Sequence, residues 1–161
     1  MFPERIGCRP ERDSPRGAAE PLGPASGRRP LPSAPMLKVE YLHEGSPDCP
    51  LIRLYGYESA DVAALRDLCL ALAESRLREV AIETQSWANT LNGCRLTFRA
   101  GRTNRGIKVR KADGPFVMEY ATEGWLEVAE KLQPFVDGSG GFQWLTNEGD
   151  VNLLISRDGR W

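Results

Sequence analysis

Short segments in which apolar and polar residues alternate, separated by turns rich in Gly, Pro, Asn and Asp, fill most of the chain after residue 36. In the first of these segments Leu37, Val39 and Tyr41 alternate with Lys38 and Glu40. A period of two places the apolar side chains on one face of an extended chain, so the pattern predicts a half-buried β-strand. Strand-like composition recurs in residues 51–57, 78–84, 94–100, 106–111, 116–121, 142–146 and 151–157.

Two segments have a helical period instead. The first is expected to be capped by Ser59 and to run to about Arg76, and the second to be capped by Thr122 and to end near Pro134 and Gly138. Their apolar stripes consist of Val62, Leu65, Cys69 and Leu72 in the first helix, and of Trp125, Val128, Ala129 and Leu132 in the second.

The order of these segments along the chain is strand, strand, helix, four strands, helix, two strands. Most neighbouring strands are joined by short connections, which favour antiparallel hairpins. The sequence therefore predicts an α+β fold, a two-layer sandwich in which two helices pack on one face of a largely antiparallel sheet.

Residues 1–35 differ in composition from the rest of the chain, because they contain eight of its 12 prolines together with six arginines. Such a segment has too few apolar residues to offset the entropy of ordering it, so we expect a disordered Pro/Arg-rich tail. Three interpretations stay open: a weak polyanion-binding tail, an SH3-type ligand around "RRPLPSAP", and a region upstream of a true start at Met36. The folded domain is predicted to be residues 36–161.

The formal net charge is -1, from 21 basic and 22 acidic residues, so the chain as a whole has no attraction for nucleic acid or anionic membrane. No apolar run approaches the roughly 18 residues that a membrane-spanning helix needs. The start of the chain is also unlike a secretory signal, so we expect a cytoplasmic protein with free thiols. Four widely spaced cysteines and one histidine predict neither a metal site nor a cofactor.

Residues 94–111 carry seven Lys or Arg side chains and no acid. Alternation places Leu96, Phe98 and Ala100 on one face, so the predicted hairpin formed by residues 94–100 and 106–111 has one apolar and one cationic face. This is either the solvated side of a sheet, with Glu119 and Glu83 supplying counter-charges, or a binding surface. The candidate contacts of that surface are Arg99, Arg102, Arg105, Lys108 and Arg110.

The connection "GRTNRG" adds two glycines, Gly101 and Gly106, at which a backbone can approach a ligand closely. Arg102 and Arg105 offer planar donor forks for carboxylate or phosphate. The segment is not a phosphate-binding P-loop, because Ile107 stands where that motif requires Lys. No exposed aromatic residue lies among the basic ones, which makes nucleic acid a less favoured partner than an acidic protein.

The four tryptophans differ in their surroundings in the sequence. Trp87, amid amides and hydroxyls, is either a contact anchor for a partner or a ring packed over the edge of the core. Trp125 and Trp144 occupy apolar registers and are expected in the core, while Trp161 either packs back or stays loose.

Catalytic residue types gather in the loop "HEGSPDCP", where Cys49 or Ser46 is a possible nucleophile and His43 a base. A proline-bounded polar loop has the same composition, and catalytic partners are recognised by geometry. Carboxylates give no stronger signal, because nothing in the sequence places two of Glu83, Glu119, Glu123 and Glu127 at a reacting distance.

Together these patterns favour a binding or regulatory module that recognises an acidic protein through the cationic sheet face. The alternatives are nucleic-acid binding by the same surface, an enzyme acting on a small anionic substrate near "GRTNRG", and a role within an oligomer. The sequence does not define the oligomeric state.

Overall fold

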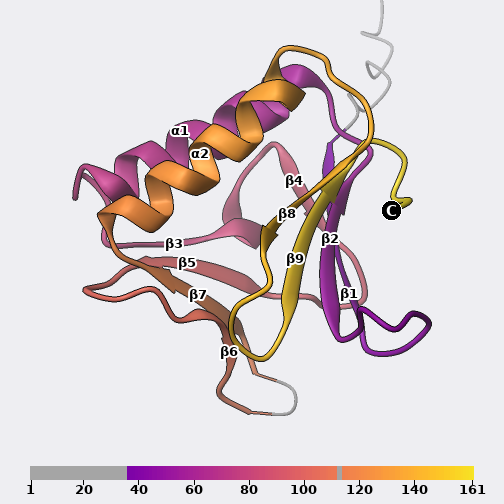
Figure 1. The fold of residues 1–161 in the computed structure, drawn as a ribbon, viewed down its shortest axis with the longest axis horizontal. Helices are drawn as coiled ribbons and strands as arrows, with labels where there is room; N and C mark the ends of the chain where they lie inside the picture. Colours follow the sequence, from indigo (N-terminus) through magenta and orange to yellow (C-terminus); the bar gives the residue numbers. More distant parts are fainter. Residues whose placement is uncertain (1–35, 112–113) are drawn as a thin grey trace, which may run out of the picture. The chain divides into compact units, whose positions relative to one another are not determined.

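The computed structural model describes residues 36–111 and 114–161. The tail predicted for residues 1–35 lies outside the described residues. Within the described ranges the chain forms two α-helices and two mixed β-sheets, and the helices pack against the sheets (Figure 1). The predicted α+β class is confirmed.

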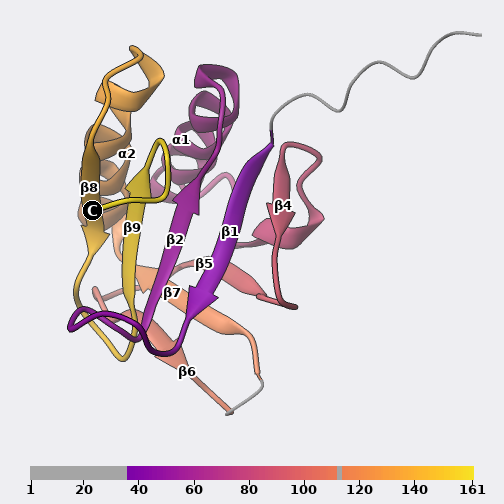
Figure 2. The ribbon, with the colours of Figure 1, turned by 90° about the vertical axis from the view of Figure 1, so that its right-hand side faces the viewer.

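Sheet A has five strands in the order β4-β1-β2-β9-β8 (Figure 2). Its strands are β1 (Leu37–Leu42), β2 (Leu51–Tyr55), β4 (Ala88–Thr90), β8 (Phe142–Thr146) and β9 (Asn152–Ser156). β1 and β2 form the first predicted hairpin and β8 and β9 the closing one, both antiparallel. β9 pairs in parallel with β2, and β4, which is not among the predicted strands, pairs in parallel with β1.

Sheet B has four strands in the order β3-β5-β7-β6. They are β3 (Glu79–Ala81), β5 (Leu96–Ala100), β6 (Gly106–Val109) and β7 (Phe116–Tyr120), and a 3-10 turn (Ile82–Thr84) follows β3. β5 and β6 do not form the expected basic hairpin, because β7 lies between them, parallel to β5 and antiparallel to β6. Like charges directly opposite one another destabilise a sheet, and β7 inserts Glu119 beside Arg99 instead.

The two helices, α1 (Ser59–Ala73) and α2 (Thr122–Val136), pack against each other and contact β5 and β7 of sheet B and β8 of sheet A. The predicted caps are wrong by one residue, because Ser59 and Thr122 are the first helical residues and the N-cap of each helix is the residue before. Glu58 caps α1, and its backbone N–H donates to the Asp61 carboxylate at 2.9 Å. Ala121 occupies the N-cap of α2, where Asn104 Oδ1 accepts its backbone N–H at 3.0 Å.

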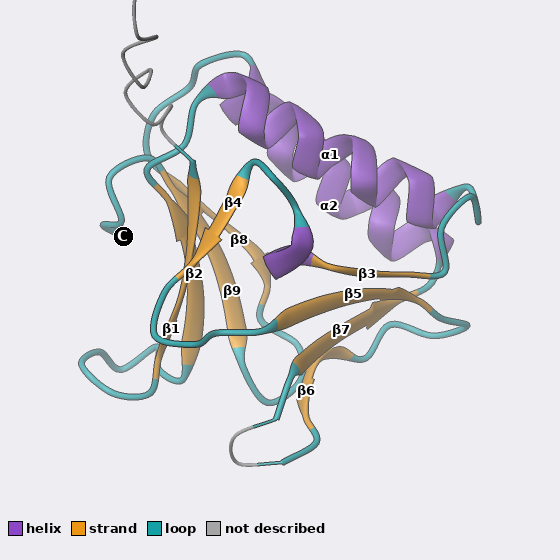
Figure 3. Cartoon of the chain, turned by 180° about the vertical axis from the view of Figure 1, so that it is seen from behind, coloured by secondary structure: helices purple, strands orange, loops and turns teal. Residues whose placement is uncertain are grey.

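The core lies between the helices and the inner faces of the two sheets. Figure 3 shows this arrangement of helices and sheets from the far side. Trp125 on α2 is fully buried and packs against Phe98 of β5, with ring centroids 5.0 Å apart. All eight residues of the two predicted helix stripes are buried. Full burial of a large apolar side chain contributes about 1.5–3 kcal/mol, so these stripes hold both helices on the sheets.

The two sheets meet where the connection between β8 and β9 reaches the edge of β6. Ile107 and Val151 form an antiparallel bridge, and the Asp150 N–H donates to the Ile107 carbonyl at 2.7 Å. Two glycines permit this approach: a Cβ on Gly106 would lie 2.0 Å from the Glu148 carbonyl oxygen, and one on Gly149 would lie 2.4 Å from that of Ile107. The β8–β9 connection therefore covers an edge of sheet B that would otherwise offer unpaired backbone.

The segment after β9 turns back across the outer face of sheet A (Figure 2). Arg53 on β2 donates to the Gly159 carbonyl at 3.0 Å, and the Trp161 indole N–H donates to Asp48 at 3.0 Å. Trp161 thus packs back on the β1–β2 loop, the first of the two alternatives that the sequence left open. Neither α1 nor α2 combines the length and apolar composition needed to cross a membrane.

Candidate functional site

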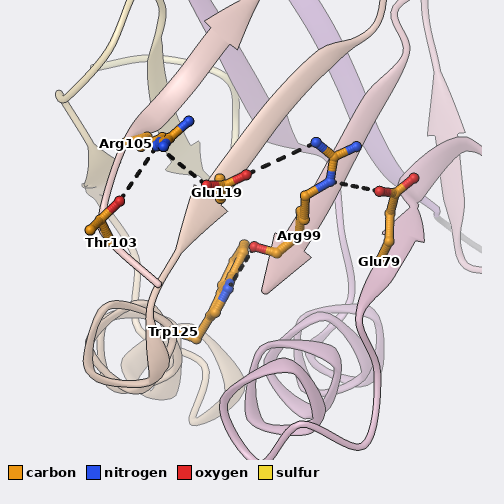
Figure 4. Close-up of polar contacts among 6 residues, drawn as sticks. All are labelled: Glu79, Arg99, Thr103, Arg105, Glu119 and Trp125. Carbon is orange, nitrogen blue, oxygen red and sulfur yellow. Dashed lines mark hydrogen bonds and ion pairs between the residues drawn. The ribbon is translucent and has the colours of Figure 1, made fainter. Parts of the chain in front are cut away.

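Two basic residues of the 94–111 stretch, Arg99 and Arg105, lie beside acids from neighbouring strands on the outer face of sheet B (Figure 4). Arg99 Nε on β5 lies 2.7 Å from Glu79 Oε2 on β3, and its Nη1 lies 4.0 Å from Glu119 on β7. Arg105 Nε lies 3.4 Å from the other Glu119 oxygen. One row across the sheet therefore carries charges of alternating sign.

A third acid, Asp150, pairs with the far strand of the sheet. Lys108 Nζ on β6 lies 3.3 Å from Asp150 Oδ1, and the Val109 backbone N–H donates to Asp150 Oδ2. The Val109 N–H and, after it, Lys108 hold the pKa of Asp150 below its ordinary value. Glu119 supplies the counter-charge that the sequence predicted, whereas Glu83 instead accepts the Leu96 backbone N–H at 3.3 Å.

The other predicted contacts are spread over the molecule. Arg102 lies in the β5–β6 connection and Arg110 after the opposite end of β6, and both are exposed. Within residues 36–111 and 114–161, neither side chain has an ion pair or hydrogen bond. Trp87 lies before β4 of sheet A, where it is partly buried against the core and its carbonyl accepts the Leu37 N–H. The structure does not bring Trp87 together with the basic residues.

The glycines of "GRTNRG" serve internal packing, not ligand approach. A Cβ on Gly101 would lie 2.5 Å from Glu119 Cγ, and Gly106 lies against the β8–β9 connection. The Gly101 N–H also donates to the Tyr120 carbonyl at 2.8 Å. This connection is therefore anchored on β7, and Asn104 within it caps α2, so it presents Arg102 from a supported backbone.

Three arginines line a pocket of about 490 Å³ at the end of sheet B where β5 ends and β3 begins. We call it the arginine pocket; its lining residues are Ser75, Leu77, Arg78, Glu79, Arg99, Ala100, Gly101 and Arg102. Its charged lining consists of three guanidinium groups and one carboxylate, Glu79, which is already bound to Arg99. Arg78 is exposed and, like Arg102, has no ion pair in the described part of the chain.

The turn that ends α1 positions the arginine pocket. Ser75 adopts a φ of 59°, and the Arg76 and Leu77 N–H groups both donate to the Ala71 carbonyl. The last helix carbonyls are therefore hydrogen-bonded and do not face the pocket as free acceptors. Arg78 follows directly and is joined to β5 because its carbonyl accepts the Ala100 N–H at 2.9 Å.

This geometry suits a carboxylate or phosphate group. Guanidinium groups donate parallel hydrogen bonds to such groups, and a pocket of this size is in the range that ligand sites occupy. Arg99 has a side chain only 26% exposed, and Glu79 and Glu119 on either side limit its rotation. Arg102 and Arg78 are the side chains free to turn toward a ligand.

The catalytic interpretation of "HEGSPDCP" receives no support from the contacts of that loop. His43 Nδ1 lies 3.2 Å from the Tyr41 hydroxyl, and its Nε2 lies 3.8 Å from Glu44. The Ser46 hydroxyl donates to Asp48. In the part of the chain that the structure describes, no contact joins His43 to Ser46 or Cys49, and no three residues of the metal-ligating types gather into a site.

Several residues of interest were missed by the sequence analysis. Arg78 and Glu79 were assigned only to a strand, although a charged pair at the start of an apolar strand is a visible signal.

The prediction that Trp144 lies in the core is wrong, because this side chain is partly exposed on the outer face of sheet A, opposite Leu154. Apolar side chains occupy both faces of β8, with Phe142 and Trp144 outside and Leu145 in the core, so alternation does not identify the buried face.

By its fold the chain belongs to the α+β class, and its candidate site is a cationic pocket at a sheet end. Comparison with known proteins adds no family to this description, since no family model, curated protein or solved structure matches the chain.

Proposed function

We propose that this chain is a binding module that recognises an acidic segment of a partner protein, with a carboxylate of the partner held in the arginine pocket. The observation that supports this most directly is the convergence of Arg78, Arg99 and Arg102 on one hollow that contains a single, already paired carboxylate. Hydrogen bonds to charged groups contribute about 1.5–3 kcal/mol each.

The charge pattern around the pocket favours a protein over nucleic acid. Glu79, Glu119 and Asp150 interrupt the basic surface, so a continuous phosphate backbone laid across sheet B would pass three carboxylates. A peptide can place one or two acidic side chains and avoid these positions. The contact residues of the proposed interface are Arg78, Arg99 and Arg102, with Arg105 at its rim.

The test is a titration of the full chain into a fluorescein-labelled peptide of mixed Asp, Glu and Ser residues, followed by anisotropy at low and physiological salt. We expect saturable binding that an Arg78→Glu, Arg102→Glu variant weakens by about tenfold or more, which corresponds to 1.4 kcal/mol. Both side chains are exposed, so the variant is expected to unfold at the wild-type temperature.

The matched control is Arg110→Glu, Lys111→Glu, which makes the same four-unit charge change at two exposed basic residues after the other end of β6. Equal loss in the control and in the pocket variant would mean general electrostatic attraction and would contradict the pocket. Duplex DNA is titrated in parallel: tighter binding of DNA than of peptide, with a steep salt dependence, would replace the proposal with nucleic-acid binding.

A further inference from the structure

A second surface, on the outer face of sheet A, is unrelated to the arginine pocket. Leu51 of β2 and Leu154 of β9 are fully buried there, although neither belongs to the main hydrophobic cluster. Strand pairing places Glu40, Arg53, Leu154 and Trp144 in one row across this face. The segment that follows β9 lies over the row, and Arg53 is bound to its Gly159 carbonyl.

One part of this face holds cations against an aromatic ring. The guanidinium carbon of Arg53 lies 4.6 Å from the Tyr55 ring centroid, and Lys38 Nζ lies 5.4 Å from it. Glu40 supplies the counter-charge, 2.7 Å from Arg53 Nη2, and accepts the Tyr55 hydroxyl at 3.0 Å. The Tyr55 ring, the cations beside it and the carboxylate that balances them therefore all belong to this chain.

Beside this cluster lies a pocket of about 710 Å³ with rings and a carboxylate of its own. We call it the aromatic pocket; it is lined by Ser46, Asp48, Phe142, Trp144, Gly159, Arg160 and Trp161. Phe142 is 48% exposed, so its ring is accessible to a ligand. Over residues 36–111 and 114–161, cation–π contacts occur only at Tyr55. No Lys or Arg of the described chain therefore covers the rings of Phe142, Trp144 and Trp161.

The pocket is held in place by hydrogen bonds. Asp48 Oδ2 accepts the Trp161 indole N–H at 3.0 Å, which orients that ring, and the Asp48 carbonyl accepts the Asn152 side chain at 2.8 Å. The loop between β1 and β2 is thereby tied both to β9 and to the segment after it. Preorganised aromatic side chains bind a ligand at a low cost in conformational entropy.

The charges in the pocket favour a cationic ligand. Asp48 is its carboxylate, and Oδ1 of Asp48 has no hydrogen bond among the described residues. The only basic residue of the lining is Arg160, whose side chain is 89% exposed and lies 3.8 Å from Asp158. Its charge therefore has a partner outside the aromatic lining.

We propose that the aromatic pocket binds a quaternary ammonium group, with the ring faces of Phe142, Trp144 and Trp161 as its walls and Asp48 as its counter-charge. A primary ammonium would need acceptors for three N–H donors, and this lining offers few beyond Asp48 and Ser46. A quaternary ammonium has no N–H to satisfy and spreads its charge over methyl groups that contact aromatic rings.

The experiment compares choline with 3,3-dimethyl-1-butanol, which has the same shape without the charge, by titrating each into the full chain and following tryptophan fluorescence. We expect saturable quenching by choline and binding of the neutral alcohol weaker by about 2- to 5-fold or more. Equal affinity for both probes, or no saturable response to choline, would overturn the proposal. A trimethyl-lysine peptide, run beside the unmodified peptide, distinguishes a protein-borne group from a free one.

Three variants test whether choline binds in the aromatic pocket. Asp48→Asn keeps the Trp161 hydrogen bond and removes the counter-charge, so it should weaken choline and leave the alcohol unchanged. Trp144→Leu should weaken both. Trp87→Phe, which replaces a partly buried tryptophan outside the pocket, is the control and should leave both affinities as in the wild type. Wild-type choline affinity in Asp48→Asn and Trp144→Leu would place the binding elsewhere and contradict the assignment.

Discussion

The indole N–H of Trp125 donates a hydrogen bond to the backbone carbonyl of Arg99, with 3.1 Å between nitrogen and oxygen. Trp125 is the largest fully buried side chain, and Arg99 lies at the edge of the arginine pocket. The bond joins helix α2 to strand β5 at the residue whose side chain faces the candidate site. The core and the pocket are therefore coupled through one backbone group.

Replacing Trp125 by Phe should destabilise the fold by about 1–3 kcal/mol, because the Arg99 carbonyl loses its donor and the core loses part of a ring. The measurement is urea unfolding followed by circular dichroism. Trp87→Phe is the comparison, since that ring is only partly buried and makes no side-chain hydrogen bond in the described ranges. Equal losses in the two variants would show that the Trp125 bond contributes nothing.

Glu79→Gln should strengthen binding of the acidic peptide by about 2- to 5-fold, because Arg99 is freed from the carboxylate that lies 2.7 Å away. Glu130→Gln, an equal charge change at an exposed position on α2, serves as control. An unchanged affinity in Glu79→Gln would indicate that Arg99 does not contact the partner.

Tyr57→Phe should leave stability unchanged or raise it by about 1 kcal/mol. The Tyr57 ring is 5% exposed, and its hydroxyl is buried without a hydrogen-bond partner among the described residues. Removing such a hydroxyl removes a desolvation cost and leaves no other group unpaired. Thermal unfolding at pH 7 is the measurement, and a loss of more than 1 kcal/mol would reveal a partner for the hydroxyl.

The same tyrosine predicts a pH dependence. Burial raises the pKa of Tyr57 from 10.0 to about 12. The unfolded chain thus releases this proton near pH 10, while the folded chain keeps it to about pH 12, so stability falls as pH rises through that window. Unfolding followed from pH 9 to 12 should show a shallower decline for Tyr57→Phe than for the wild type. Parallel curves would assign the decline to other groups, such as Cys69 and Cys94, whose pKa values burial also raises.

Gly106→Ala should be far more destabilising than Gly93→Ala. Both glycines have a positive φ, 63° and 67°, so both substitutions carry a similar backbone strain. A Cβ at Gly106 would also lie 2.0 Å from the Glu148 carbonyl oxygen, whereas a Cβ at Gly93 would meet nothing within 4 Å. Denaturant unfolding measures the difference. Similar losses would mean that the β8–β9 connection moves aside without cost.

The positions of the helices and the apolar faces of the strands were predictable because both follow from the local spacing of apolar residues. The stripe that includes Val62 and Leu72 and the stripe around Trp125 are both buried, as their spacing indicated. Strand partners were not predictable, because alternation shows which face is apolar but not which strand lies beside it. The one-sheet prediction therefore gave way to two sheets, with β7 between the two basic strands. β4 has three residues, too few for a period to be recognised.

Two of the three arginines that line the arginine pocket were predicted from the sequence as binding residues. Arg99 and Arg102 were among the expected contacts, since they belong to a conspicuous basic stretch. Arg78 was not, because it comes near them only through the pairing of β3 with β5, about 20 residues away along the chain. The aromatic pocket had no local signal at all: its members come from the β1–β2 loop, β8 and the segment after β9.

The central place of β9 in sheet A has a consequence for synthesis on the ribosome. Every strand of sheet B lies between residues 79 and 120, whereas sheet A takes strands from both sides of that interval. β4 of sheet A lies within that interval, between β3 and β5, so the strands of the two sheets are interleaved in chain order. Sheet B and α1 can associate once residue 120 has emerged, but β2 has no parallel neighbour until β9 follows. During that interval β2 pairs with β1 alone, so its other edge carries unpaired backbone groups, and such an edge favours association with other chains.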